Sequence, residues 1–128
     1  NSAVRSKIAN WYVQESGLNY SSYRTLTALS RGDLPGPENS IGKLVAAHKM
    51  QAMSSYLLDL MDYGGVISDK AVSELSARIQ YSYMSSAGLR IAGGTDEIMS
   101  NIIAERVLGL PQEPRADKGI PFKDVPTR

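Results

Sequence analysis

Apolar side chains recur at helical spacing through the first thirty residues, a stretch without proline. Between residues 3 and 30 they form one stripe at steps of three, four, seven or eight: Val4, Ile8, Trp11, Leu18, Leu26 and Leu29. Such a stripe is typical of an amphipathic helix that packs on one side. The segment 31–37 (RGDLPGP) ends it, because a glycine C-cap signal is followed by prolines that cannot continue a helix. Since no cap precedes this helix, we expect the chain to be part of a longer protein.

A second helix is predicted from Pro37 to about Asp62. Pro37 suits the first helical position, where its missing N–H costs nothing, and Glu38 complements the positive end of the helix dipole. The early apolar positions share one face and the later ones point in several directions: Ile41, Leu44, Val45 and Ala52, then Leu57, Leu58, Leu60 and Met61. A helix that is apolar on more than one side packs on more than one side. We therefore expect a central helix that contacts both its own bundle and another subunit.

Two shorter helices are predicted after the sequence YGG at residues 63–65, which ends the second helix. Ser68 suits the N-cap of a helix over residues 69–86. The apolar side chains on its inner face are Val72, Leu75, Ile79 and Tyr83. A fourth helix follows a double glycine and runs to Leu108, where Gly109 and a proline stop it. Its inner face holds Ile98, Ile102, Ile103 and Val107.

These segments predict an all-α fold, and no part of the chain shows a strand pattern. Short connections favour an antiparallel up-down helical bundle over residues 1–110. Residues 111–128 hold four of the six prolines, few apolar residues and no periodicity. We expect them to form an extended C-terminal tail.

Composition narrows the class of protein. A chain of 128 residues is one domain by length and can bury about 68% of its unfolded surface. A formal charge of +1 gives no electrostatic reason to expect nucleic acid or an anionic membrane as a partner. The absence of cysteine excludes disulfides and thiolate chemistry. Neither a signal peptide nor an apolar run near the ~18 residues that span a bilayer is evident, so we expect a cytoplasmic protein.

The double glycine, Gly93-Gly94, followed by Thr95 is the first candidate site. Two glycines allow unusual backbone dihedrals and the close approach of another group. Thr95 can cap the fourth helix, whose first N–H groups then form a small anion or carbonyl site. Asp96 and Glu97 suit the positive helix end, although they would repel a phosphate lying very near. A plain capped helix start is the competing interpretation.

Other polar residues are candidates of a weaker kind. Glu15 is either a buried carboxylate with a raised pKa or a helix-edge acid paired with a nearby Arg or Lys. His48, the single histidine, is interpreted as a hydrogen-bonded core or interface residue, because no catalytic or metal-ligand spacing accompanies it. Asp59 and Asp62 are explained by solvation. Arg106 pairs either with a carboxylate inside the bundle or at the surface. No metal site is predicted.

Two segments resemble a known family. Residues 90–111 (RIAGGTDEIMSNIIAERVLGLP) are similar to the closing signature of acyl-CoA dehydrogenases, and residues 36–44 (GPENSIGKL) resemble the segment that opens their preceding long helix. The matches occur in order and cover roughly residues 20–126. Enzymes of this family have a helical N-terminal domain, a small β domain and a C-terminal four-helix bundle. The resemblance implies that this chain is that C-terminal bundle, lacking one helix of the parent.

The resemblance also implies a reaction. Family enzymes are oxidoreductases of fatty acid metabolism that remove the α and β hydrogens of an acyl-CoA thioester. A carboxylate takes the α proton, and FAD accepts the β hydride and later passes electrons to an electron-transfer flavoprotein or another acceptor. They are usually tetramers with each FAD bound across a dimer interface. FAD, acyl-CoA, such an acceptor and further copies of the chain are therefore the implied cofactor and partners.

The family pattern assigns flavin contacts residue by residue. Thr95 and Glu97 fall on positions whose counterparts contact FAD, and Gly93 and Gly94 would form the turn beside the flavin. Residues 61–65 correspond to a glycine-containing loop that meets the partner subunit's FAD. The implied cofactor-binding residues are Gly64, Gly65, Gly93, Gly94, Thr95 and Glu97.

One departure concerns the catalytic base. Many family members place a glutamate just before the Gly-Thr pair, where this chain has Ala92 and Gly93, neither of which accepts a proton. No catalytic residue is therefore assigned. Some members carry the base on an earlier helix, and others have lost it and serve in a mixed oligomer. We expect an inactive part of a dehydrogenase with weak or absent FAD binding; a non-catalytic partner subunit is the alternative, and a free-standing helical interaction domain is a third.

Overall fold

The computed structural model describes residues 1–112, 114–115, 117 and 119–125 of the chain. Its α-helices are α1 (Ser2–Ser30), α2 (Asn39–Leu60), α3 (Arg78–Leu89) and α4 (Asp96–Ile102). Shorter 3-10 segments are η1 (Asp62–Val66), η2 (Glu74–Ala77) and η4 (Phe122–Asp124), and η3 (Ile103–Val107) is a π-helical turn. The described part contains no strand, so the predicted all-α class is confirmed.

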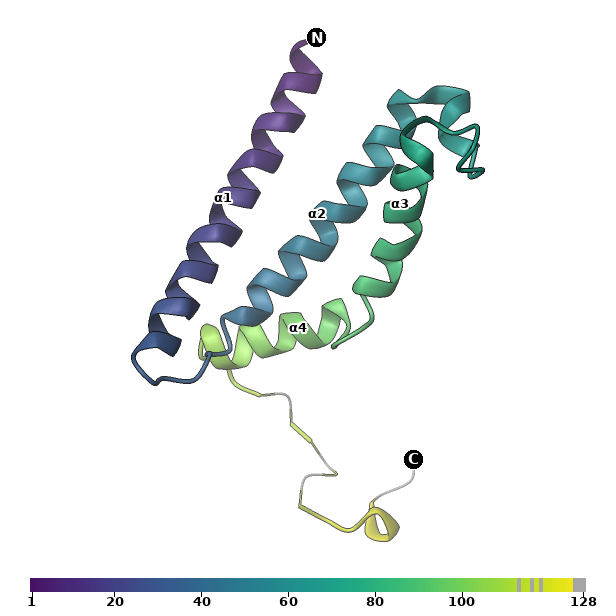
Figure 1. Cartoon of the computed structure of the whole chain (residues 1–128). Helices are drawn as coiled ribbons and strands as arrows, with labels where there is room; N and C mark the ends of the chain where they lie inside the picture. The colour runs from purple at the N-terminus through teal and green to yellow at the C-terminus, as the bar shows by residue number, and fades with distance from the viewer. Residues whose placement is uncertain (113, 116, 118, 126–128) are drawn as a thin grey trace.

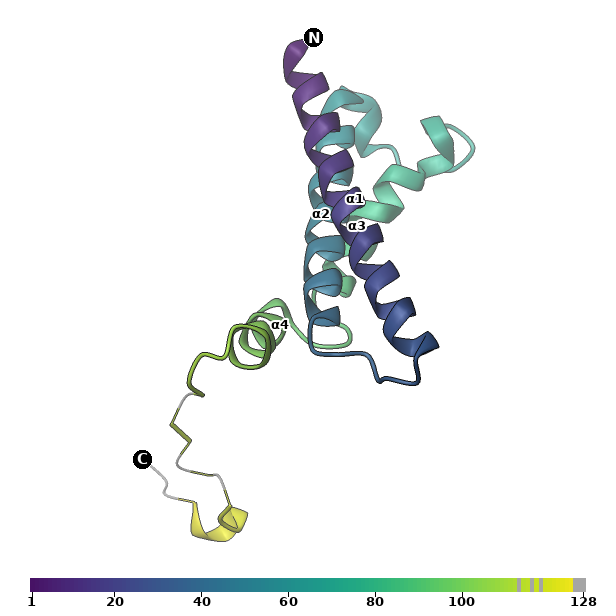
Figure 2. The same cartoon turned by 90° about the vertical axis from the view of Figure 1, so that its left-hand side faces the viewer.

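Helices α1, α2 and α3 run antiparallel to one another in sequence order, and α4 lies across the end where α2 begins (Figure 1). The view turned by 90° shows the same crossing, with α4 seen end-on beside the base of α2 (Figure 2). Helix α2 packs against α1, α3 and α4, and its contact with α3 is the most extensive. It is therefore the central helix, as predicted; its contact with another subunit stays a prediction.

Both ends of α1 have identifiable caps. The side-chain oxygen of Asn1 accepts a hydrogen bond from the N–H of Ala3 at 3.0 Å, so the expectation of an uncapped start was wrong. At the other end Gly32 adopts a φ of +85°, which glycine reaches without steric cost. The N–H groups of Gly32 and Asp33 bond to carbonyls of the last helical turn, at 3.0 Å each. This is the Schellman arrangement that the glycine predicted.

Helix α2 is shorter than predicted at both ends. Pro37 lies in a turn before the helix, its carbonyl accepting from the N–H of Ser40 at 3.0 Å, and the helix begins at Asn39. Glu38 occupies the N-cap position without a side-chain cap hydrogen bond. The helix ends at Leu60 rather than Asp62, because Asp62 has a φ of +49° that a right-handed helix does not accept.

The third helix was predicted to begin too early. Residues 69–77 form turns and η2, and α3 begins only at Arg78. The Asp69 carboxylate accepts the N–H of Ala71 at 2.8 Å, as a capping residue does, but the turn that follows does not continue into α3, and Ser68 is not the N-cap of α3. Residues 75–77 then have φ values of +51° to +56°, a left-handed conformation that costs about 1–2 kcal/mol per residue. The predicted inward-facing Leu75 is consequently exposed, as are Val72 and Tyr83.

The fourth helix lies where the sequence predicted it, but the side chain that it buries is not one of those predicted. Helix α4 continues into the π-helical turn η3, and Gly109 with a φ of +69° follows. Met99 is the buried side chain of α4, at 7% exposure, whereas the predicted Ile98 is half exposed. Because α4 crosses α2 instead of running beside it, the buried face lies around Met99, next to Gly94.

Small side chains occupy the best-buried positions. Ala47 and Ser54 on α2 and Ser86 on α3 are at most 4% exposed, so the two helices approach closely. The Ser86 hydroxyl donates to the carbonyl of Tyr83 at 2.6 Å and is thus not left unsatisfied. Large apolar residues lie at the margins instead. The predicted inner stripe of α1 was wrong in this respect, since α1 contains no buried residue.

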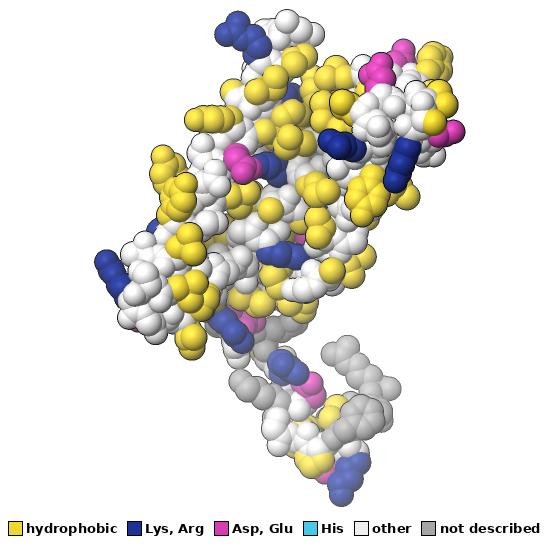
Figure 3. Space-filling model, viewed as in Figure 1, with side chains coloured by type: hydrophobic (Ala, Val, Ile, Leu, Met, Phe, Trp, Pro, Cys, Tyr) yellow, Lys and Arg dark blue, Asp and Glu magenta, His cyan; other side chains and the backbone are white. Residues whose placement is uncertain are grey.

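The chain exposes much more surface than a compact monomer of its mass. Its accessible area is 9914 Å², against roughly 6,700 Å² for a typical folded monomer of 13.9 kDa. By the same scaling, folding buries about half of the unfolded surface, less than the share expected from length. Figure 3 shows apolar side chains along the whole length of α1 and beside α2 and α3. Several on α1 are at least 60% exposed: Tyr12, Val13, Tyr20, Tyr23 and Leu26.

The C-terminal stretch is described only in part. Of the predicted tail over residues 111–128, positions 113, 116, 118 and 126–128 lie outside the described residues. In the remainder the one helical element is η4. None of the helices described here combines the length and the apolar composition needed to cross a membrane.

We predict that the isolated chain self-associates through the apolar side chains of α1. The accessible area of the whole chain exceeds that of a typical monomer of its mass by roughly 3,200 Å², which is more than a standard protein interface buries. The double variant Val13→Ser/Leu26→Ser should shift the chain toward monomer and reduce binding of an apolar dye, as measured by light scattering and fluorescence. The control Asn19→Ala/Ser22→Ala, also on exposed positions of α1, should change neither. A clean monomer without dye binding in the unmodified chain would contradict the prediction.

Candidate functional site

The elbow, defined as residues 93–95, joins α3 to α4. Gly93 has a φ of +69° and Gly94 a φ of +110°, and the second value is available in practice only to glycine. Thr95 is extended (φ −68°, ψ 167°), and its Oγ1 accepts the N–H of Ile98 at 3.3 Å. The predicted N-cap role of Thr95 is therefore confirmed. The elbow turns the chain sharply into α4 while its own backbone stays near the surface.

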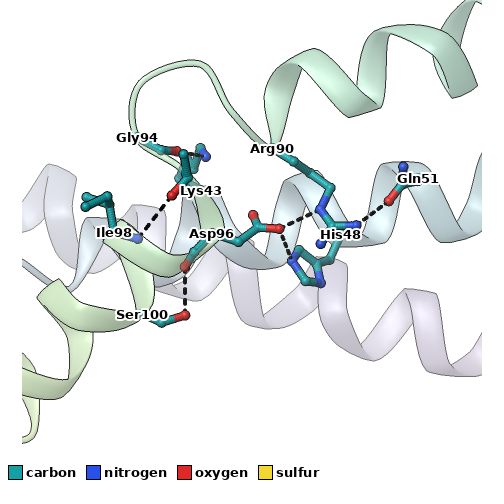
Figure 4. A network of polar contacts seen from close by, with 9 residues as sticks. Lys43, His48, Gln51, Arg90, Gly94, Asp96, Ile98 and Ser100 are labelled. Carbon is teal, nitrogen blue, oxygen red and sulfur yellow. Dashed lines mark hydrogen bonds and ion pairs between the residues drawn. The ribbon is translucent and has the colours of Figure 1, made fainter.

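The Asp96 side chain points from the first turn of α4 toward α2 (Figure 4). Its Oδ2 accepts hydrogen bonds from Arg90 Nε at 2.5 Å and from His48 Nε2 at 2.9 Å. Arg90 Nη1 in turn donates to Gln51 Oε1 at 2.6 Å. One carboxylate oxygen thus joins the end of α3, the middle of α2 and the start of α4.

A separate hydrogen bond holds the other side of the elbow. Lys43 Nζ, near the start of α2, donates to the carbonyl of Gly94. Thr95 therefore lies between two residues that are both tied to α2. We call the side chains that make these contacts the polar network: Lys43, His48, Gln51, Arg90 and Asp96.

The acids of the first turn of α4 have lowered pKa values. Desolvation acts to raise the pKa of Asp96, whose side chain is 15% exposed, but the hydrogen bonds from Arg90 and His48 outweigh it and lower that pKa below its usual 3.8. The Thr95 side chain and its own backbone N–H lower the pKa of Glu97. A general base at neutral pH needs the opposite shift. The two carboxylates can bind donors or cations, but they are poor proton acceptors.

The structure brings four of the six predicted cofactor-binding residues together. Gly93 and Glu97 are exposed and Gly94 and Thr95 half-buried at the corner between α3 and α4. Gly64 and Gly65 lie in η1, which follows the other end of α2 (Figure 1). The two groups thus occupy opposite ends of one helix. Their assignment to two different flavins, one of them the partner subunit's, stays a prediction.

Gly65 is required by local packing. It is buried, and a Cβ added there would lie 2.6 Å from the carbonyl oxygen of Leu58. Gly64 has open space around it, the nearest atom to an added Cβ being 3.9 Å away, and its carbonyl accepts from Gln80 Nε2 at 3.3 Å. Close approach of η1 to the end of α2 thus accounts for Gly65 without any ligand.

The remaining polar candidates from the sequence have exposed side chains. Glu15 is 54% exposed and pairs with Lys49, so the helix-edge interpretation is confirmed. His48 is hydrogen-bonded as predicted, but its side chain is 50% exposed and does not lie in a core. Asp59, Asp62 and Arg106 are exposed, which excludes a buried carboxylate partner for Arg106. Among the described residues there is no cluster of three or more His, Asp or Glu that could hold a metal ion.

The sequence did not reveal Lys43 and Gln51 as members of the site. Together with His48 they occupy roughly 140° of the circumference of α2 at 100° per residue, on a helix otherwise rich in apolar residues. That polar patch was the available signal. Its partners, Arg90 and Asp96, are roughly 40 to 50 residues away in sequence, so periodicity alone could not identify them.

The chain is similar to known proteins over most of its length. Residues 1–108 match the family model described as acyl-CoA dehydrogenase, C-terminal domain. The chain is 37% identical over 81 residues to acyl-CoA dehydrogenase FadE34 of Mycobacterium tuberculosis, covering 63% of this chain and 10% of that protein. It is 35% identical over 79 residues to acyl-CoA dehydrogenase IpdE1 of Mycolicibacterium smegmatis, covering 62% of this chain and 19% of that protein. No solved structure matches. The aligned part thus spans less than a fifth of either relative.

We predict that Gly65→Ala destabilises the chain by about 1–3 kcal/mol, because the new Cβ overpacks against the Leu58 carbonyl. Gly64→Ala, one residue earlier and in open space, should change the free energy of unfolding by less than about 1 kcal/mol. Urea unfolding of both variants measures the difference. Equal effects at the two positions would show that the close approach at Gly65 is unimportant.

A second prediction concerns pH. Since the folded pKa of Asp96 lies below 3.8, its carboxylate contributes stability above that pH and loses the contribution as pH falls through the lowered folded value. Asp96→Asn should therefore lower the urea midpoint near pH 7, and the gap to the unmodified chain should narrow as the pH falls below 3.8. Glu97→Gln is the matched control, with a smaller effect expected because Glu97 is exposed. A gap that stays constant with pH would refute the ionic contribution.

Proposed function

The chain belongs to the acyl-CoA dehydrogenase family, as its C-terminal helical domain, and we propose that its elbow forms part of the flavin site in an FAD-dependent α,β-dehydrogenation of acyl-CoA thioesters. The observation that carries the proposal is the elbow itself, a glycine turn tied to α2 on both sides of Thr95. Acyl-CoA as substrate and an electron-transfer flavoprotein as acceptor belong to the same proposal, for the whole protein.

The residues of the elbow fit a flavin on chemical grounds. A Cβ added at Gly93 would meet nothing within 4 Å, so a flat ring system can approach the backbone there. The Thr95 hydroxyl is adjacent, and the exposed, ionised Glu97 can accept a hydrogen bond from a ring N–H or a ribityl hydroxyl. The negative charge of Glu97 disfavours the diphosphate at this position. The elbow therefore suits the ring and ribityl part of FAD.

Positioning is the role we assign to this chain in the reaction. When bound, the flavin supplies the hydride acceptor. Thr95 and Glu97 would hold and orient it, while α2 keeps the elbow from moving away. Ala92 and Gly93 carry no titratable group, and the lowered pKa values of Asp96 and Glu97 make both poor bases. No proton transfer is assigned to these residues.

That absence of a base at the elbow favours a second candidate, a non-catalytic subunit that supports flavin binding in a mixed oligomer. Both candidates use the same elbow in the same way. They differ in whether a carboxylate elsewhere in the whole protein reaches the α carbon of the substrate. Flavin bleaching by acyl-CoA in the whole protein alone would favour the enzyme, and bleaching only in the presence of another subunit would favour the mixed oligomer.

We predict that Glu97→Ala in the whole protein weakens FAD binding about 10–100-fold, the cost of losing one charge-assisted hydrogen bond. Equilibrium dialysis of FAD, followed by its visible absorbance, measures the change. Asp33→Ala is the control, because it removes an exposed carboxylate from the connection between α1 and α2 and should leave the affinity unchanged. Unaltered affinity in Glu97→Ala would contradict the proposed flavin contact.

A further inference from the structure

Two consecutive acids at the start of α4 face in different directions. The Glu97 carboxylate is on the surface, whereas the Asp96 side chain is only 15% exposed and points at α2 (Figure 4). Favourable interaction with the helix dipole would be available to Asp96 in solvent as well. Its removal from water therefore needs another cause, and the two hydrogen-bond donors that meet its Oδ2 provide one.

The two side chains that donate to Asp96 belong to helices other than α4. Arg90 is the C-cap residue of α3, and His48 belongs to the middle of α2. Arg90 is itself held by Gln51, so its guanidinium is fixed from both sides. Asp96 thereby connects α4 to two other helices through a single oxygen, and its other oxygen, Oδ1, is buried without a hydrogen-bond partner among the described residues.

The elbow needs such an attachment because little else fixes it. Its two glycines have positive φ and can rotate more freely than other residues. Helix α4 has seven residues, packs on α2 and contributes a single buried side chain, Met99. Backbone hydrogen bonding within α4 sets the helix but not its angle to α3. The contacts that set this angle are those of the polar network together with the packing of Met99.

We propose that Asp96 is the positioning residue of the elbow. Through Arg90 and His48 it fixes the start of α4 on α2, with Lys43 holding the Gly94 carbonyl on the other side, so that Thr95 and Glu97 are presented in one orientation. The assignment of Asp96 rests on the geometry of this chain. Its consequence for flavin binding rests on the function proposed above.

The chemistry of the contact gives a specific signature. An ionised carboxylate is an acceptor only, so His48 must carry a proton on Nε2 to bond to Asp96. His48 is the single histidine of the chain, and its imidazole nitrogens can be followed without overlap in a long-range proton–nitrogen spectrum. The charged groups around this contact are Asp96 and Glu97 on α4 and Arg90 at the end of α3, with Lys43 on α2 itself.

The test uses the full 128-residue chain and two readouts. In Asp96→Ala, the nitrogen signature of a hydrogen-bonded Nε2–H on His48 should disappear. Amide exchange of Ile98 and Met99, whose N–H groups are held by Thr95, should accelerate about tenfold for the loss of one hydrogen bond. Amides of α2 outside the polar network, such as that of the buried Ser54, should change less than about twofold.

Conservative and control variants separate positioning from general stability. Asp96→Asn keeps the shape and one acceptor oxygen, so it should restore part of the His48 signature and part of the protection, and it replaces Asp96→Ala if that variant does not fold. Glu97→Gln should alter neither readout. Unchanged exchange of Ile98 and Met99, or equal loss of protection throughout α2, would overturn the proposal.

Measurements of FAD affinity in the whole protein distinguish this inference from the proposed function. None of the readouts above requires flavin, so their failure would leave the flavin proposal standing. If Asp96→Ala loosens the elbow but neither it nor Glu97→Ala alters FAD affinity in the whole protein, the positioning role holds and the flavin contact fails. If both variants weaken FAD binding, the two conclusions support each other.

Discussion

The geometry of the elbow depends on one carboxylate oxygen, Asp96 Oδ2, which accepts hydrogen bonds from Arg90 and His48 at 2.5 and 2.9 Å. The connection from α3 to α4, residues 90–95, contains two glycines with positive φ, so it does not by itself fix the angle of the fourth helix. Attachment to α2 supplies that constraint. The directions of the Thr95 hydroxyl and the Glu97 carboxylate follow from it.

Helix α2 is the platform for both glycine-containing segments. It carries side chains of the polar network from near its beginning, at Lys43, to its middle, at His48 and Gln51, and η1 with Gly65 packs against its end. Small residues let α3 lie close to it, and the larger apolar side chains remain on the outside, most of all on α1. A domain with so much exposed apolar surface is suited to packing against further protein on several sides. This agrees with a chain whose aligned part spans less than a fifth of its relatives.

Local signals predicted the parts of the fold that local forces determine. The proline-free first helix, the Schellman end at Gly32 and the Thr95 cap each follow from neighbouring residues alone. The predicted start of the third helix was too early because residues 75–77 have positive φ values, which a right-handed helix does not accept. The predicted set of buried residues was wrong where small residues such as Ser86 occupy the contact between α2 and α3. Contacts between residues 43–51 and 90–96 depend on tertiary folding, and no short-range pattern encodes them.

The most direct test of the flavin-side elbow is the structure of the whole protein with FAD bound. We predict that the flavin lies against Gly93, with the Thr95 hydroxyl or the Glu97 carboxylate within about 3.2 Å of a flavin or ribityl polar atom, and with the contacts of Asp96 to α2 retained. An elbow that faces bulk solvent, with the flavin bound elsewhere, would contradict it.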